Sequence, residues 1–353
     1  MPSNLIIAAV GDDSLHEKWL PGTGRRSFDV MLVYYGSKGD RYRSQCDHYM
    51  KSTGLKWPLL AEAQERFGEA IDKYDAVWCP DDDLSIDAAS IDEMFHIFHE
   101  FDLNLAQPSL APGSHAWFRT TRQCPFALLR FVRQVELGAP IFSRMTLNLL
   151  AHTFRWSESG WGLDMLWAKL LDYQKMAIIH AVAVTHTRPY FVGGAYSGKR
   201  PMDDARRLVQ KYDLWDALSG AGIVLSTVLR SDATDYVKRL FEFDLPTEFD
   251  ADPDPVKAIG VRFGIRVEGV GEWFVNASPS GPACAVGSGP ADCTVAFSSR
   301  DAFLKYLEAP RGEMVGLFLN GQLEIGGRQT EARKLARVFE RLYPYKHVEP
   351  EDM

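Results

Sequence analysis

Residues 77–84 read Val-Trp-Cys-Pro-Asp-Asp-Asp-Leu, so an apolar run leads directly into three consecutive carboxylates. Carboxylates this close repel one another, and we expect a counter-ion to accompany them in the folded chain. A hard divalent cation takes oxygen ligands and can bridge to the phosphates of a substrate. Alternate side chains of an extended segment share a face, so Asp81 and Asp83 would point the same way. The segment predicts a Mg²⁺ or Mn²⁺ site at a strand end, and a solvated acidic turn is the alternative.

Two earlier apolar runs also end at turn residues. Residues 5–10 precede Gly11, and residues 28–35 precede Gly36. Short apolar runs bounded in this way are typical of strands buried on both faces of a parallel sheet. Residues 59–71 and 90–101 have helical spacing. This alternation predicts a Rossmann-like α/β domain with a mostly parallel sheet, which binds its ligand at the carboxyl ends of the strands.

The pattern changes after about residue 215. Pro and Asp crowd residues 243–255, which we interpret as a loop or linker, and apolar residues then alternate from Val261 to Val267. Asn320-Gly321 between alternating apolar residues predicts a β-hairpin. We therefore divide the chain into an α/β domain (1–215), a helical linker (216–231), an α+β domain (232–346) and a tail (347–353).

Composition narrows the class of partner. The formal net charge of −8 argues against a nucleic acid held by phosphate contacts. The chain has no uncharged apolar run of about 18 residues, so we expect no transmembrane segment. Five cysteines without a C-x-x-C spacing favour reduced thiols and a cytoplasmic location. A P-loop, a dinucleotide fingerprint, zinc spacing and a G-x-S-x-G elbow are all missing from the sequence.

The Asp-Asp-Asp-Leu segment resembles the D-x-D-L motif of a domain family related to GT-A glycosyltransferases, found in proteins labelled lysine-ketoglutarate-reductase trans-splicing related. Pro80 departs from that family, which tends to have a bulky residue there. The resemblance extends over roughly residues 4–195, and Gly-Trp-Gly-Leu-Asp-Met at 160–165 is its most specific further part. The other matching stretches are residues 30–36, 106–110, 114–122, 136–144 and 185–186.

The resemblance implies transfer of a sugar from a nucleotide-diphosphate donor to an acceptor hydroxyl. Asp83 would then be the primary metal ligand, and Asp81 would contact the metal or the ribose. His186 would complete the metal shell, or it is a satisfied histidine at a strand end. Asp82, in the same segment, is a further candidate for substrate binding.

The second group of candidates follows from residues 160–165. Asp164 would be the general base for the acceptor hydroxyl, would hold the donor sugar, or would cap the helix that begins there. Trp161 and Gly162 lie in the same turn, and the indole would stack on a sugar ring or belong to the core.

The remaining candidates would contact the nucleotide. Arg122, Arg144 and Arg188 carry the fork-shaped guanidinium that suits a diphosphate, and the alternative for each one is a surface arginine. Asp12 and Tyr35 end the first two strands, where base and ribose sit in this class of fold. Lys56 would reach a phosphate.

Residues 232–346 resemble the sterol-carrier-protein-like domain, most specifically in the pattern F-x-x-G-x-L-x-I-x-G at 318–327. The resemblance implies a sheet over an apolar tunnel that binds a lipid or presents a hydrophobic acceptor. A structural role, or a role in forming a homodimer, is the alternative. For the whole chain, the alternatives to a transferase are a non-catalytic nucleotide-binding or lipid-carrier module and a metal-dependent hydrolase or phosphotransferase.

Overall fold

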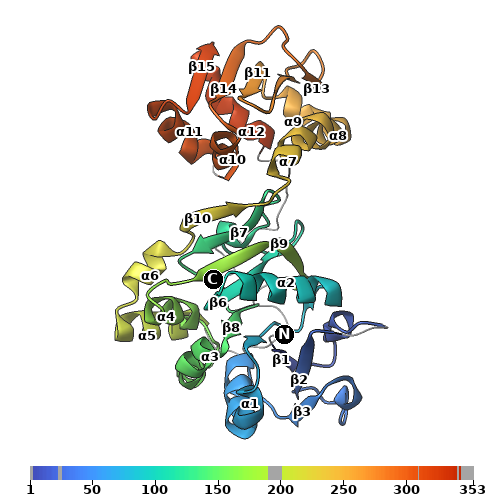
Figure 1. Cartoon of the computed structure of the whole chain (residues 1–353), viewed down its shortest axis with the longest axis vertical. Coiled ribbons are helices and arrows are strands. Elements are labelled where there is room, and N and C mark those ends of the chain that lie inside the picture. The colour runs from blue at the N-terminus through green and yellow to red at the C-terminus, as the bar shows by residue number, and fades with distance from the viewer. Residues whose placement is uncertain (1–2, 23–25, 190–200, 309, 340–341, 343–353) are drawn as a thin grey trace. The chain divides into compact units, whose positions relative to one another are not determined.

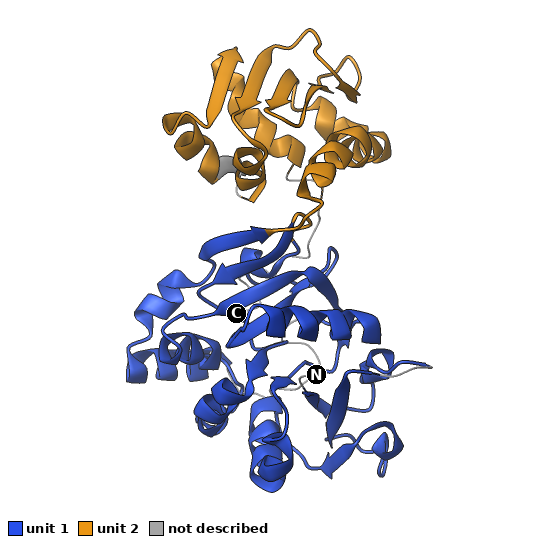
Figure 2. Ribbon diagram, viewed as in Figure 1, with its two compact units in different colours: residues 1–123, 127–228, 345–353 blue, residues 124–126, 229–344 orange. Residues whose placement is uncertain are grey.

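The computed structural model describes residues 3–22, 26–189, 201–308, 310–339 and 342. The chain divides into two compact units, drawn in blue and orange in Figure 2. Unit 1 comprises residues 1–123, 127–228 and 345–353, and unit 2 comprises residues 124–126 and 229–344. The predicted tail (347–353) lies outside the described residues, as do residues 343–346 of the predicted second domain.

In the described part of unit 1, ten strands form one sheet in the order β10-β7-β9-β6-β8-β4-β1-β2-β3, with β5 paired to β9 (Figure 1). The strands are β1 (Asn4–Val10), β2 (Phe28–Tyr34), β3 (His48–Lys51), β4 (Ala76–Trp78), β5 (Leu84–Ser85), β6 (Leu105–Leu110), β7 (Ala127–Val132), β8 (Ile141–Ser143), β9 (Met176–His186) and β10 (Val224–Leu229). The runs that we predicted as the first three strands of the domain therefore form β1, β2 and β4.

The sheet is mixed, and the prediction of a mostly parallel sheet is wrong in this respect. Strands β4, β1, β2 and β3 are parallel, as are β6 and β9. Strand β8 runs antiparallel to both β4 and β6, and β7 and β5 run antiparallel to β9. An apolar run carries no information on strand direction, and a three-residue strand such as β8 is too short to show a pattern.

Two cores cover the two faces of this sheet. Leu5, Ile7 and Ala9 belong to one core, and the alternate residues of β1 belong to the other. The first core includes residues of α1, α3, α4, α5 and α6, and the second includes residues of α2. The helices of unit 1 are α1 (Lys56–Ile71), α2 (Ala88–Glu100), α3 (Arg144–Leu150), α4 (Leu163–Leu170), α5 (Pro201–Tyr212) and α6 (Trp215–Gly220), and 3₁₀ turns occupy His16–Trp19, Arg43–Gln45, Arg119–Thr121 and Ala151–Trp156. Strands buried on both faces explain the continuous apolar runs.

Residues 216–231, predicted as a helical linker, instead contain the end of α6 and the strand β10. Residues 243–255, interpreted as a loop, are largely helical because α8 (Leu245–Ala251) and α9 (Pro253–Lys257) follow the π-helical turn Leu240–Asp244. Each of these two helices has a proline in its first turn, where the backbone needs no donor. The prolines in residues 243–255 therefore lie at the starts of helices, and they do not indicate a linker.

Unit 2 contains a five-stranded sheet in the order β13-β12-β11-β14-β15. Its elements are α7 (Ala233–Arg239), β11 (Val261–Val267), β12 (Gly271–Ala277), β13 (Ala283–Val286), β14 (Cys293–Phe297), α10 (Arg300–Glu308), α11 (Pro310–Leu319), β15 (Leu323–Gly327), a 3₁₀ turn at Gln329–Leu335 and α12 (Ala336–Phe339). Alternate residues of β11 are buried, as the sequence predicts. On that face Phe241 stacks on Trp273 with ring centroids 4.4 Å apart, and Phe303 and Phe339 lie 5.4 and 6.0 Å from Phe241.

The hairpin predicted at Asn320-Gly321 is wrong. The residues before it form the helix α11, and the strand β15 begins two residues after Gly321. Gly321 has φ +67°, and the amide of Gln322 donates to the carbonyl of Leu317 at 2.8 Å. A left-handed glycine ends helices as readily as it makes hairpin turns, so the dipeptide alone does not separate the two.

Candidate active site

The three aspartates follow β4 in a segment that is hydrogen-bonded to residues 138–140. The amide of Cys79 donates to the carbonyl of Pro140 at 2.8 Å, and the amide of Asp81 donates to that of Gly138 at 2.7 Å. These bonds hold Asp81 beside Gly138, and Asp82 and Asp83 then form a turn before β5. Asp83 lies with Asp81 near His186, whereas Asp82 contacts Gly11 and Tyr35.

Asp81, Asp83 and His186 converge on one point. One candidate ligand atom from each residue lies within 4.8 Å of the other two. His186 ends β9 and pairs with Leu84 of β5, and its Nε2 atom lies 3.4 Å from Oδ2 of Asp83. Two carboxylate oxygens and one imidazole nitrogen are a donor set that Mn²⁺ and Mg²⁺ accept. Burial raises the pKa of Asp83, and the nearby His186 opposes that rise.

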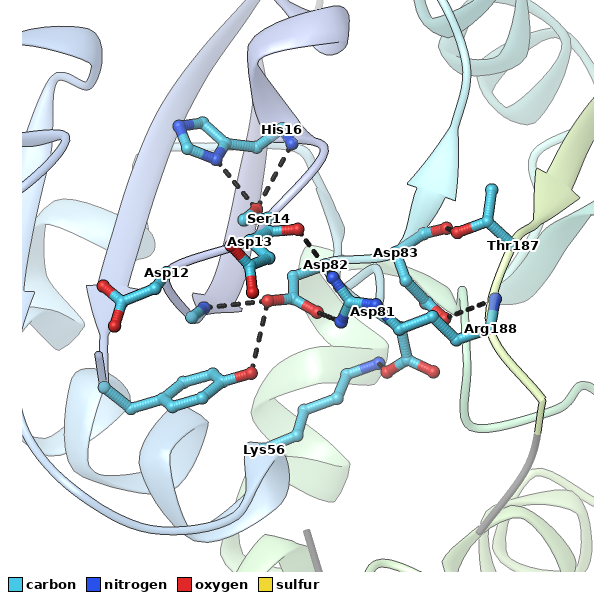
Figure 3. Close-up of polar contacts among 12 residues, drawn as sticks. Asp12, Asp13, Ser14, His16, Lys56, Asp81, Asp82, Asp83, Thr187 and Arg188 are labelled. Atoms are coloured by element: carbon cyan, nitrogen blue, oxygen red, sulfur yellow. Dashed lines mark hydrogen bonds and ion pairs between the residues drawn. The ribbon is translucent and has the colours of Figure 1, made fainter. Parts of the chain in front are cut away.

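Basic side chains already reach two of the aspartates (Figure 3). The ammonium of Lys56 donates to Oδ1 of Asp81 at 2.7 Å and to the carbonyls of Leu137 and Gly138 at 2.8 and 3.1 Å. The guanidinium of Arg188 donates to Oδ1 of Asp82 at 3.0 Å. The repulsion that the sequence predicts is thus partly relieved by the chain itself.

Asp82 is held in place by hydrogen bonds from other parts of unit 1. Its Oδ2 atom accepts from the amide of Gly11 at 2.8 Å and from the hydroxyl of Tyr35 at 3.2 Å. Burial and the charge of Asp82 raise the pKa of Tyr35. With Arg188 on its other oxygen, Asp82 ties the ends of β1, β2 and β9 together.

Asp12 points away from the three aspartates in Figure 3. It accepts from the hydroxyl of Tyr34 and from the amide and hydroxyl of Ser37 at 3.2 and 3.0 Å. The hydrogen bond from Tyr34 lowers the pKa of Asp12 to about 2. Asp12 therefore orders the loop after β2, at the edge where we expected the base and ribose.

A second polar centre surrounds Asp164. Its Oδ2 atom accepts from Nε2 of Gln134 at 2.6 Å, and burial raises its pKa. Glu136 accepts from the amide of Phe118 at 3.3 Å and from the hydroxyl of Thr121 at 3.4 Å. Burial, with a contribution from the charge of Asp164, raises the pKa of Glu136 to about 7. A carboxyl with a pKa of about 7, as in Glu136, suits proton transfer near neutral pH.

The prediction that Asp164 caps its helix is not met. Gly162, with φ +90°, is the N-cap of α4, and Asp164 lies in the first turn. Trp161 meets Trp117 edge to face, with ring centroids 5.5 Å apart. The turn thus brings Trp161, Gly162 and Asp164 together, as the sequence indicates.

The two other arginines have different positions. The backbone of Arg122 pairs with Leu110 at the end of β6, which is the sheet edge that also carries His186. Arg144 lies 3.5 Å from Asp75, which precedes β4, whereas Asp81 follows β4. Arg144 is therefore at the opposite end of that strand, and its proposed role with the diphosphate is wrong.

Sequence reasoning missed Gln134, Glu136 and Trp117 as site residues. Glu136 lies in a stretch that carries the family resemblance, and this was the one available signal. Gln134 and Trp117 lie in irregular segments without periodicity, so only the fold brings them near Asp164. His115, whose ring centroid is 6.3 Å from that of His186, is a further addition.

The segment from Gln134 to Gly138 connects the two centres. Gln134 contacts Asp164, while Leu137 and Gly138 contact Lys56, which bonds to Asp81. The charges of Asp164 and Asp81 both act on the carboxyl of Glu136, which lies in this segment. The two centres are therefore neighbours in the fold.

No family model and no curated protein matches the sequence. Among solved structures, the chain is similar to two transferase structures over more than half of its length and to sterol carrier protein structures over about a third. GalNAc-T7, solved with UDP, GalNAc and Mn²⁺, is 9% identical over 59% of this chain and 48% of its own, with a TM-score of 0.42. S. aureus TarS is 14% identical over 74% of this chain and 48% of its own, with a TM-score of 0.41. Sterol carrier protein 2 from Yarrowia lipolytica, in the apo form, is 16% identical over 31% of this chain and 88% of its own, with a TM-score of 0.24.

Among the described residues, no helix combines the length and the apolar character needed to cross a membrane.

Proposed function

We propose that the protein is a metal-dependent glycosyltransferase that moves a sugar from a nucleoside-diphosphate donor to an acceptor hydroxyl. The observation that carries the proposal is the convergence of Asp81, Asp83 and His186 at the end of β4. These residues come from two separate parts of the chain, and a buried carboxylate, Asp164, is connected to them through one short segment. A charged cluster and a buried acid or base side by side are what group transfer from a diphosphate needs.

Asp81, Asp83 and His186 would hold Mn²⁺ or Mg²⁺, which neutralises charge on the diphosphate leaving group. Arg188, held by Asp82, and Lys56, held by Asp81, would add fixed positive charge around the phosphates. Asp164 would take the proton of the acceptor hydroxyl. That hydroxyl oxygen then bonds to the anomeric carbon, and the bond from this carbon to the diphosphate breaks with its electron pair.

The proposal is tested first by thermal unfolding with UDP, GDP, dTDP and their sugars, each with and without Mn²⁺. A metal-dependent rise in Tm with one nucleotide is expected, since a ligand of the native state stabilises it by mass action. Donor hydrolysis without an acceptor is then compared for the wild type and for Asp81→Asn, Asp83→Asn and Asp164→Asn. Asp203→Asn, an exposed change on α5, is the matched control.

Loss of hydrolysis in the three site variants but not in the control supports the transferase. Full activity in all three would rule it out. Nucleotide binding without turnover in the wild type would favour the non-catalytic module instead.

For unit 2, the aromatic packing against Trp273 supports a structural role, with lipid or hydrophobic-acceptor binding as the alternative. Fatty acids and sterols in the same thermal assay distinguish the two. A rise in Tm with either would favour the carrier role.

A further inference from the structure

Arg130, a buried arginine of unit 1, has neutral hydrogen-bond partners. The residue lies in β7 and is only 6% exposed. Its Nε atom donates to Nε2 of His180 at 2.7 Å, and its Nη2 atom donates to the carbonyl of Thr120 at 2.8 Å. These are the hydrogen bonds that its guanidinium makes to the described residues, and neither acceptor is a carboxylate. Buried charges are normally paired, so an anion is the partner that Arg130 lacks.

The partners of Arg130 do not neutralise its charge. Because Nε2 of His180 accepts from the guanidinium, that nitrogen carries no proton and the imidazole is neutral. Burial and the charge of Arg130 lower the pKa of His180 well below its usual range. The carbonyl of Thr120 carries no charge either. Arg130 therefore keeps its full positive charge inside unit 1.

The two hydrogen bonds also determine which part of the guanidinium is left to bind a ligand. A guanidinium has five N–H groups in a rigid fork. Nε uses its single N–H and Nη2 uses one of two, so the end of the fork formed by Nη1 and Nη2 has no acceptor in the described part of the chain. Nη1 is not one of the fully enclosed atoms without a partner there, so solvent reaches it. Two adjacent terminal nitrogens match two oxygens of a carboxylate or a phosphate.

The position of Arg130 in the sheet is close to the second polar centre. Arg130 in β7 and Gln107 in β6 both pair with Ile178 of β9, so the three residues form one row across the sheet. Neighbouring strands are about 4.8 Å apart, so the backbones of Arg130 and Gln107 are about 10 Å apart. Gln107 accepts from the amide of Glu136 at 2.5 Å, which joins this row to the second polar centre.

The same register separates Arg130 from the proposed diphosphate site. Gln107 is three steps before Leu110 in β6, and Leu110 pairs with Val184 of β9. His186 is two steps further along β9, so it lies about five steps, or about 16 Å, beyond the row of Arg130. A diphosphate beside His186 therefore does not reach Arg130, and the anion must belong to another ligand.

We propose that Arg130 binds a carboxylate or phosphate group of the acceptor through Nη1 and Nη2 of its guanidinium. The inference rests on the proposed function and adds the chemical class of the acceptor. That acceptor is an acidic molecule, which carries an anionic group together with the hydroxyl that receives the sugar. Carboxylates and phosphates share the chemistry that Arg130 recognises, and the test separates them.

The test derives anion affinity from the rise in Tm at constant ionic strength, because a ligand of the native state stabilises it by mass action. The probes are glycerate and glycerol 3-phosphate, which carry hydroxyls beside a carboxylate or a phosphate, and glycerol is the neutral control. Each probe is titrated into the protein alone and into protein with Mg²⁺ and UDP, GDP or dTDP, which fill the diphosphate site. Both arms use the wild type, Arg130→Gln and the control Arg66→Gln, a change at an exposed arginine of α1.

Arg130→Gln removes both the charge and the fork, so we expect it to lose about tenfold or more in affinity for one or both anions, the order of one hydrogen bond to a charged group. The anion that loses affinity identifies the acidic group of the acceptor. Arg66→Gln should bind the probes as the wild type does. Arg130→Lys keeps the charge without the fork and should also lose affinity, so it serves if Arg130→Gln fails to fold.

Equal anion affinities in the wild type and Arg130→Gln would overturn the inference, as would a wild type that binds neither anion. Anion binding that disappears when the nucleotide is added would place the anion at the diphosphate site and overturn it as well. In each case intact metal-dependent binding of a nucleoside diphosphate would leave the proposed function standing. A wild type that binds no nucleotide would remove that function and the assignment to an acceptor, and a loss in Arg130→Gln would then support an anion site alone.

Discussion

Replacing Glu136 with glutamine should make the stability of unit 1 less dependent on pH. The pKa of Glu136 is raised from 4.5 to about 7, chiefly by burial. Between these values the folded state binds about one proton more than the unfolded state, so stability falls as pH rises. Each pKa unit corresponds to about 1.4 kcal/mol, so the whole fall amounts to about 3 kcal/mol at most. Below pH 4.5 the carboxyl is protonated in both states and this contribution is fully present.

Glutamine cannot ionise, so Glu136→Gln should lack this fall. We expect the variant and the wild type to unfold at similar urea concentrations at pH 4.5. At pH 8 the variant should be more stable by about 1–3 kcal/mol. Urea unfolding followed by tryptophan fluorescence measures unit 1, because Trp273 is the sole tryptophan in the sequence of unit 2.

Glu69→Gln, a change at an exposed glutamate of α1, is the control and should show no such pH-dependent gain. A constant difference between Glu136→Gln and the wild type from pH 4.5 to 8 would refute the reasoning. It would mean that the Glu136 carboxyl ionises as easily in the folded chain as in the unfolded one.

Three further changes test other parts of unit 1. Asp83→Asn removes a charged metal ligand and should weaken Mn²⁺ binding by about tenfold or more in calorimetry, whereas unchanged affinity would place the metal elsewhere. Lys56→Met removes a positive charge 2.7 Å from Asp81 and should tighten Mn²⁺ binding by about tenfold, while Lys18→Met, whose ammonium contacts Ser85, should not. Gly162→Ala places a Cβ atom at φ +90° and 3.0 Å from Cα of Ala205, so it should lower stability by about 1–2 kcal/mol. Gly68→Ala, in the last turn of α1 with open space around the new Cβ, should not. Equal urea midpoints for the two alanine variants would contradict the strain at Gly162.

The strands and the acidic segment could be predicted because their signals are local. The apolar runs at β1, β2 and β4 are continuous, since each strand is buried on both faces. Alternation in an extended segment predicts that Asp81 and Asp83 share a side, and an oxygen of each lies within 4.8 Å of the other. Asp82 and Asp83 form a turn, so this proximity does not come from strand alternation.

The second polar centre could not be predicted in full because its contacts are tertiary. Gln134 and Asp164 are 30 residues apart, and Gln134 follows β7 in a segment without regular structure. The prediction of strand direction was wrong for the same reason. Whether β8 runs parallel or antiparallel to β4 depends on the chain connection between them and not on the three residues of β8. Arg144 was misplaced because its motif spans β8, which carries the chain to the other end of the sheet.

The charge balance of the acidic segment leads to a last prediction, on the coupling of metal and nucleotide. Three aspartates share Lys56 and Arg188, so with a neutral His186 the cluster carries about one net negative charge. A divalent ion would turn this into about one net positive charge, which a nucleoside diphosphate would then offset. Each ligand should therefore raise the affinity of the other by the same factor, as linkage requires. Calorimetric titration of Mn²⁺ with and without saturating nucleoside diphosphate measures that factor, which we expect to reach about tenfold. Equal Mn²⁺ affinities in the two titrations would mean that the two ligands do not share this cluster.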